Sequence, residues 1–137
     1  MKDTMDMLAD IQGYFIADSV LPGIIGITDT TDMTQCDAKF RQSFADSTLI
    51  TADELNFLDF SFIISNSETS NYLVNKEMLE LNIYASNLYQ ATLIYKEVKR
   101  IFNDKYPEMH RTNPCQAGCP VAGIVRYMFR AKPLVGS

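Results

Sequence analysis

The chain has 137 residues, of which 47% are apolar, the usual share for a globular protein. Its formal net charge of −5 argues against a general grip on nucleic acid, because phosphate binding needs clustered Lys and Arg. No apolar run approaches the roughly 20 residues that span a bilayer, and the acidic N-terminal residues do not resemble a secretory signal. The sequence therefore predicts a single cytoplasmic domain over residues 1–137.

The first predicted element is an amphipathic helix that begins near Asp3 or Thr4 and ends before Pro22. Its apolar residues recur at spacings of three and four and share one helical face: Met5, Leu8, Ile11 and Phe15. Residues 26–53 show no clear periodicity and are rich in Thr and Asp, which prefer turns and caps. A short strand or a helical turn is expected in the segment KFRQSFADSTLI.

Two strands follow, in the segments LNFLDFSFIIS and MLELNIYA. In the first, alternation places four apolar side chains on one face: Leu58, Phe60, Phe62 and Ile64. In the second, one face carries Leu79, Leu81, Ile83 and Ala85, and the other carries Met78, Glu80, Asn82 and Tyr84. The mixed second face indicates a half-exposed strand in a sheet that is covered on one side.

A helix follows the second strand almost directly, with Ser86 or Asn87 as its cap. Its apolar stripe is formed by Leu88, Ala91, Tyr95, Val98 and Phe102, widened by Ile94 and Ile101. A long Pro- and Cys-containing loop is predicted at about 103–123, and such a loop is either functional or ordered by a partner. The last segment, IVRYMFRAKPLV, alternates like a strand.

The resulting order, α-β-β-β-α-β, predicts an α+β two-layer domain in which a mainly antiparallel or mixed sheet carries two helices on one face. The other face would expose apolar side chains in a cluster, and such clusters mark contact surfaces. Alternatively, residues 26–53 of the same chain cover these apolar side chains. The last strand adds two cations that either prevent stray strand pairing or pair with a neighbouring subunit. The candidate interaction residues are Phe57, Ile63, Met78, Tyr84, Arg126 and Arg130.

A zinc site is one alternative, since His110, Cys115 and Cys119 lie close in sequence and Cys36 is a possible fourth ligand. Zinc knuckles usually place two residues between paired thiols, whereas the segment CQAGC has three. Two ordinary thiols in a turn are therefore the favoured interpretation, with a disulfide between them as the next. We expect no metal and no cofactor.

A metal-dependent nuclease is the other alternative, because Asp59 and Glu80 on neighbouring strands are placed to share Mg²⁺. Restriction-type nucleases carry an acid, then Glu-x-Lys on the next strand, then a helix. Here the segment reads ELN, so Asn82 stands where the lysine is needed. Two acids on a solvated sheet face are the simpler interpretation. The single histidine also lacks a Ser or Asp pattern to orient it, and we expect no enzyme.

The N-terminal helix, the strands, the unit LELNIYASN that leads into SNLYQATLIYKEVKRIF, and the closing strand GIVRYMFRAKPLV resemble the tail terminators of long-tailed bacteriophages. These tail-completion proteins join head and tail. The resemblance implies a structural virion protein of the tail or neck, assembled in the host cytoplasm, without a catalytic site.

The same resemblance implies the partners. They are further copies in a ring, as a hexamer, together with the tail tube protein and the head connector or neck proteins. DNA would pass through the lumen without specific binding, and no membrane is involved. An acidic chain fits such a lumen, because carboxylates repel phosphate.

Overall fold

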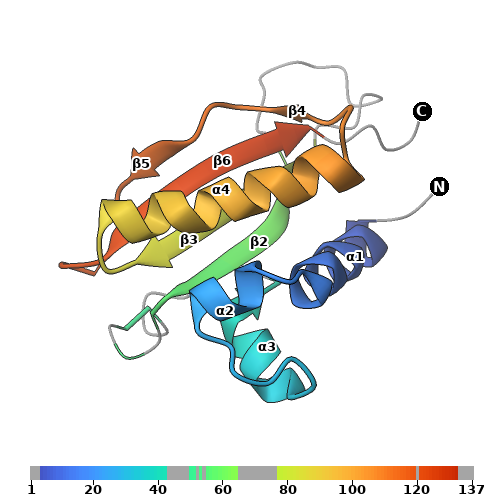
Figure 1. Cartoon of the computed structure of the whole chain (residues 1–137). Helices are drawn as coiled ribbons and strands as arrows, with labels where there is room; N and C mark the ends of the chain where they lie inside the picture. The colour runs from blue at the N-terminus through green and yellow to red at the C-terminus, as the bar shows by residue number, and fades with distance from the viewer. Residues whose placement is uncertain are drawn as a thin grey trace.

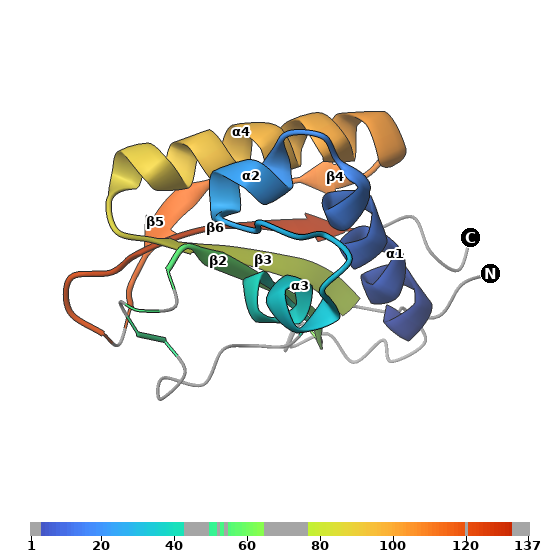
Figure 2. The same ribbon diagram turned by 60° about the horizontal axis from the view of Figure 1, so that its bottom comes forward.

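The computed structural model describes residues 4–42, 50–51, 53, 55–64, 77–119 and 121–132. Helices cover one face of a six-stranded sheet (Figures 1 and 2). The helices are α1 (Thr4–Ala17), α2 (Leu21–Ile25), α3 (Met33–Lys39) and α4 (Leu88–Lys105). The strands are β1 (Phe40–Arg41), β2 (Phe57–Ile64), β3 (Glu77–Ala85), β4 (His110–Arg111), β5 (Cys115–Ala117) and β6 (Val125–Lys132).

The strand order is β1-β2-β3-β6-β4, and β5 also pairs with β6. Only the pair of β1 with β2 is parallel, so the sheet is mixed. The predicted α+β fold is therefore confirmed. The predicted order of elements is matched roughly, because the described chain adds two short helices and two short strands to it.

The predicted first helix is divided in two. α1 ends at Ala17, and the carboxylate of Asp18 then accepts hydrogen bonds from the backbone N–H groups of Val20 and Leu21, at 3.0 and 2.9 Å. Pro22 is not the helix terminator that the sequence predicts. It lies in the first turn of α2, where its missing N–H costs nothing. Gly26 ends α2 with a φ of 97°, which favours glycine.

Residues 26–42 contain β1 and also α3, which the sequence pattern did not locate. The carboxylate of Asp32 caps α3 by accepting hydrogen bonds from the backbone N–H groups of Thr34 and Gln35. The expected strand or turn in KFRQSFADSTLI is a two-residue strand, in which Phe40 pairs with Leu58 of β2. Residues 43–49 of that segment lie outside the described residues.

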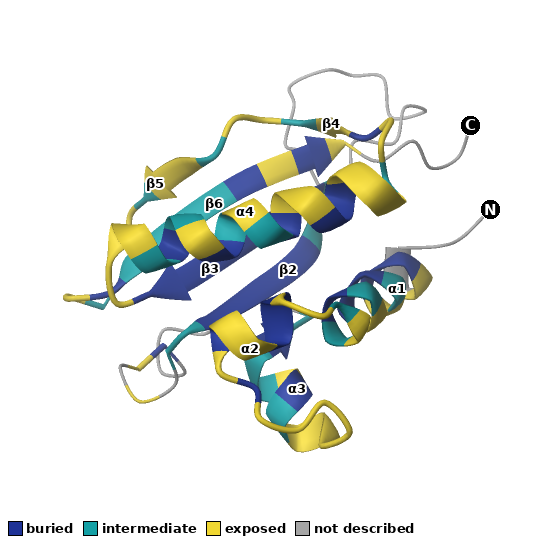
Figure 3. Cartoon of the chain, in the orientation of Figure 1, coloured by how far each residue is buried: buried dark blue, intermediate teal, exposed yellow. Residues whose placement is uncertain are grey.

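The main core lies between the helices and one face of the sheet (Figure 3). Phe15 of α1 is fully buried there, with its ring centroid 5.4 Å from that of Phe40 and 5.5 Å from that of Phe60. The buried stripe of α4 consists of Ala91, Ile94, Val98, Ile101 and Phe102. The helical periodicity is therefore confirmed for the described side chains of both long helices, except that Leu88 is exposed. The side chain of Met5 lies outside the described ones.

The prediction of one long loop at about 103–123 is wrong. α4 continues to Lys105, and β4 and β5 then pair antiparallel with β6. Thr112 adds two hydrogen bonds, from its backbone N–H to the carbonyl of Arg130 and from the backbone N–H of Arg130 to its hydroxyl. The described residues of this part of the chain are thus held in part by pairing with β6.

Candidate functional site

The sheet face opposite the helices carries a group of polar residues around a buried centre, which we call the polar cluster. Its members come from β2, β3 and β6: Asp59, Glu80, Asn82, Arg126 and Arg130. Asp59 and Asn82 are fully buried, and Glu80 nearly so. The prediction of a half-exposed β3 is therefore wrong, because residues 79–85 are buried on both faces.

The amide of Asn82 lies at the centre of the polar cluster. Its Nδ2 donates to Oδ1 of Asp59 at 3.0 Å and to Oε2 of Glu80 at 3.2 Å. Its Oδ1 accepts a hydrogen bond of 2.7 Å from Nε of Arg126. One neutral side chain thus separates two carboxylates and links them to a cation, which satisfies buried groups that are costly to leave unpaired.

Two arginines neutralise Glu80. Nε of Arg130 lies 3.0 Å from Oε1 of Glu80, and Nη2 of Arg126 lies 3.6 Å from Oε2. Arg126 also donates through Nη1 to the carbonyl of Gly118, at 3.1 Å. Within the described residues, Ser61 is the one buried side chain whose oxygen has no hydrogen-bond partner, and it lies opposite Glu80 in the strand pairing.

This geometry favours a structural network over a metal site. A cation between Asp59 and Glu80 would have to displace the amide of Asn82 and compete with two guanidinium groups for Glu80. No group of three or more His, Cys, Asp and Glu side chains in the described part of the chain is arranged to hold a metal ion.

The prediction that Phe57 and Tyr84 are exposed contact residues is wrong, because both are buried. Their rings stack with centroids 4.8 Å apart, in a second apolar cluster with Ile50 and Ile124. Burial, together with the negative charge of Asp59, raises the pKa of Tyr84 to about 12. The alternative, in which residues 26–53 cover these side chains, holds in part, because Ile50 of that segment packs in this cluster.

The other predicted contact residues differ in how far their side chains are buried. Met78 is half-buried and Arg130 is exposed. Arg126 is half-buried, and both arginines point into the polar cluster at their hydrogen-bonding atoms. The side chain of Ile63 lies outside the described ones.

The residues of the zinc alternative do not converge. Cys36 is buried in the main core on α3, beside β1 at one edge of the sheet. His110 and Cys115 are exposed on β4 and β5 at the opposite edge, and Cys119 packs against the second apolar cluster. All three thiols are free.

Several large apolar side chains at α2 and on the first half of α4 are exposed, and these two helices pack together. We call this group the apolar helical surface: Val20, Ile24, Leu88, Tyr89 and Leu93. Tyr89 is 71% exposed. Sequence reasoning missed this surface, because it placed Leu88 in the buried stripe of α4 and assigned no role to Tyr89 and Leu93, which lie one turn apart.

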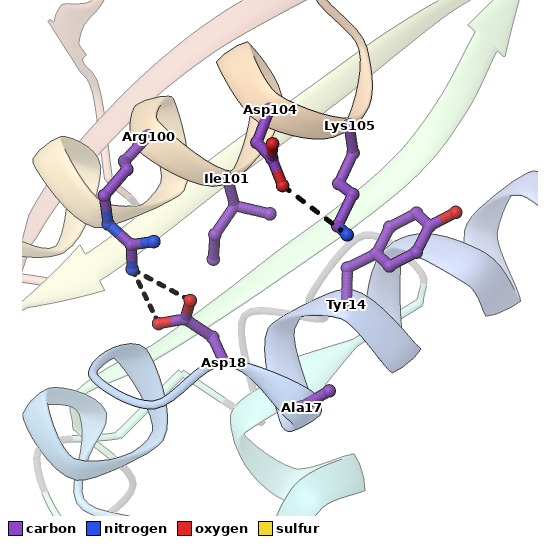
Figure 4. Close-up of a pocket in the computed structure, with 7 residues that line it drawn as sticks. All are labelled: Tyr14, Ala17, Asp18, Arg100, Ile101, Asp104 and Lys105. Atoms are coloured by element: carbon purple, nitrogen blue, oxygen red, sulfur yellow. Dashed lines mark hydrogen bonds and ion pairs between the residues drawn. The ribbon is translucent and has the colours of Figure 1, made fainter.

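A small depression of about 190 Å³ lies between α1 and α4 (Figure 4). Nη2 of Arg100 lies 2.7 Å from the Asp18 carboxylate at one end, and the ammonium of Lys105 lies over the ring of Tyr14 at the other. Lys105 also pairs with Asp104 at 3.5 Å. These charges are already paired within the chain. The ion pair of Arg100 with Asp18 acts as a tether between α4 and the end of α1.

We expect this tether to depend on pH. Partial burial alone would raise the pKa of Asp18, but hydrogen bonds from Arg100 and two backbone N–H groups outweigh it and lower that pKa below 3.8. The stabilisation is therefore present above the ordinary pKa and is lost as the pH falls through the lowered one. Arg100→Ala should lower the free energy of unfolding only slightly near neutral pH, because solvent screens this ion pair.

Urea denaturation of the wild type and Arg100→Ala checks this expectation. The two proteins should differ near neutral pH and converge once Asp18 is protonated. Asp18→Asn serves as the control, because its stability should lack this part of the acid dependence. A difference that persists unchanged in strong acid would contradict the assignment.

Comparisons with known proteins give no family for this chain. The sequence matches no protein-family model and has no significant match among curated proteins. Among the described residues, no helix combines the length and apolar character needed to cross a bilayer.

Proposed function

We propose that this chain is a structural virion protein that forms a ring at the head–tail junction of a long-tailed bacteriophage. In this role it caps the tail tube and joins it to the connector. The observation that carries the proposal is the arrangement of β3, α4 and β6. β3 leads into α4 after two residues, α4 crosses the sheet, and β6 returns beside β3 (Figure 1). This is the strand-to-helix unit and closing strand on which the resemblance to tail terminators rests.

The β3–α4 unit has the rigidity that a ring-building element needs. The side chain of Asn87 caps α4 by accepting a hydrogen bond from the backbone N–H of Gln90, at 2.9 Å. β3 lies between β2 and β6, paired along most of its length with both. A unit held in this way presents the same surface in every copy, and a closed ring repeats one such contact between its copies.

The polar cluster supports an assembly role over the nuclease alternative. Asp59 and Glu80, the acids that a nuclease would use, are buried and engaged with Asn82 and two arginines. The apolar helical surface supports a protein partner, since exposed apolar groups of this kind mark contact sites. The implied partners are further copies, the tail tube protein and the connector.

Light scattering over a range of concentrations, with and without a tail tube protein, tests the proposal. Particles of six copies, or a complex with tube or connector proteins, would support it. A strictly monomeric mass under every condition would contradict it. A robust Mg²⁺-dependent nuclease activity that Glu80→Gln abolishes would also contradict it and favour the enzyme.

We expect Tyr89→Glu to weaken binding to the tube or connector protein by about ten-fold or more, because it places a charge in a desolvated contact. The fold should be unaffected, since the side chain is 71% exposed. Binding is measured by titration, and folding by circular dichroism. Tyr89→Phe should bind normally, and Ala9→Glu, on an exposed position of α1, is the charge-matched control. Equal losses in Tyr89→Glu and Ala9→Glu would show that the apolar helical surface is not the contact.

A further inference from the structure

The charges of this chain are separated along its sequence. Residues 3–37 contain seven aspartates and no lysine or arginine: Asp3, Asp6, Asp10, Asp18, Asp29, Asp32 and Asp37. Residues 109–137 contain no acidic residue and four cations: Arg111, Arg126, Arg130 and Lys132. The overall charge of −5 hides this asymmetry, which only the positions of the residues reveal.

The fold places these two parts at opposite edges of the sheet. α3 and the turn before it lie beside β1, at one end of the strand order, and β4 lies at the other end (Figures 1 and 2). We call Asp29, Asp32 and Asp37 the acidic surface, and Arg111, Arg130 and Lys132 the basic edge. Arg111 lies on the helix side of this edge, and Arg130 and Lys132 lie on the side of the polar cluster. Met33, 52% exposed, adds an apolar side chain to the acidic surface.

The acidic surface keeps its charge within the folded chain. The carboxylates of Asp29 and Asp32 accept hydrogen bonds from neutral groups of Thr31, Thr34 and Gln35. Asp37 accepts one from the side-chain amide of Gln12, at 2.9 Å. None of these three exposed aspartates forms an ion pair with a described residue, so their negative charges remain available to a partner.

The basic edge is likewise incompletely neutralised. Arg111 donates to the carbonyl of Lys99 and to the side chain of Asn103, which are both neutral. Arg130 shares Glu80 with Arg126, and its side chain is still 47% exposed. Lys132 is exposed, and no ion pair joins it to the described part of the chain.

We infer that the basic edge of one copy docks against the acidic surface of a second copy. The two surfaces are complementary in charge, and complementary charges fix both partner and register at interfaces. The acidic surface and the basic edge lie at opposite edges of one sheet. Each copy therefore presents its acidic surface to one neighbour and its basic edge to the other. Such a head-to-tail contact repeats and closes into a ring when its rotation allows. This inference deepens the proposed ring and rests on it.

Charge reversal tests the contact. Asp37→Lys and Lys132→Glu should each weaken self-association by about ten-fold or more, because each brings like charges together. Glu108→Lys is the matched control for Asp37→Lys. It makes the same change in net charge at an exposed position outside the acidic surface and should not weaken association. Asp37→Asn keeps the acceptor for Gln12 and should cause a smaller loss.

Mixing the two reversal variants gives the sharper result. An equimolar mixture of Asp37→Lys and Lys132→Glu should recover association. In the mixture, the negative charge added to the basic edge by Lys132→Glu meets the positive charge added to the acidic surface by Asp37→Lys. Association of the wild type should also weaken as salt rises from about 50 to about 500 mM. Sedimentation velocity measures all of these, and thermal unfolding confirms that each variant is folded.

Three outcomes would overturn the inference. Rings that form equally well with every reversal variant would place the contact elsewhere and leave the proposed function standing. A wild type that never associates, alone or with a tube protein, would remove both. Duplex DNA bound by the wild type but not by Lys132→Glu, with self-association unchanged, would make the basic edge a nucleic-acid contact.

Discussion

Replacing both Arg126 and Arg130 with alanine is expected to lower the free energy of unfolding by about 3 kcal/mol. The double variant leaves Glu80, only 3% exposed, without a cation in a buried position. The expected loss is at the low end for a buried charge, because the arginines lie partly in solvent and water can approach from that side. Urea denaturation at neutral pH measures it.

The single variants and a rescue show whether charge is the cause. Each arginine variant alone should lose about 1 kcal/mol, because the other arginine still pairs with Glu80. The double loss should therefore exceed the sum of the single losses. Adding Glu80→Gln to the double variant should restore much of the stability, since a neutral amide needs no cation. Additive single losses without this rescue would show that the arginines stabilise by packing alone.

The second large effect is expected from Phe15→Ala, which should lower the free energy of unfolding by about 3–5 kcal/mol. Phe15 is fully buried, and its ring contacts those of Phe40, Phe60 and Phe102. Its removal opens a cavity at the point where α1 meets both the sheet and α4. Denaturant unfolding followed by far-UV circular dichroism gives the value.

Two controls accompany Phe15→Ala. Phe15→Leu keeps most of the volume and should lose only about 1–1.5 kcal/mol. Tyr89→Ala, on the exposed side of α4, should change stability by less than about 0.5 kcal/mol. A small effect of Phe15→Ala would mean that α1 contributes little to the core, contrary to its buried position.

The polar cluster has a consequence for strand register. Asp59 lies directly opposite Asn82 across β2 and β3, and Asn82 lies opposite Met128 of β6. A slip of one residue in either pairing would turn every side chain to the other face. Buried carboxylates would then enter the apolar core and lose the amide and guanidinium donors. The cluster therefore favours one alignment of three strands.

The sequence by itself determined the long elements. Alternation over eight or nine residues located β2, β3 and β6, and the 3.6-residue period with an Asn cap located α4. These signals are local, because a side chain's face follows from its position in the strand or helix. Their order was enough for the α+β class. Short elements escaped, since β4 and β5, with two and three residues, are too short for any period and exist only through pairing with β6.

Only the tertiary structure decided what each face meets. Alternation separated Glu80 and Asn82 from the apolar face of β3, but it did not show that the second face is also buried. That burial depends on cross-strand neighbours far apart in sequence, since Arg126 and Arg130 reach β3 from 44 and 50 residues away. In the same way, the charge of each segment could be read from the sequence. Its place at one edge of the sheet follows from strand order, which is fixed by pairing between distant segments.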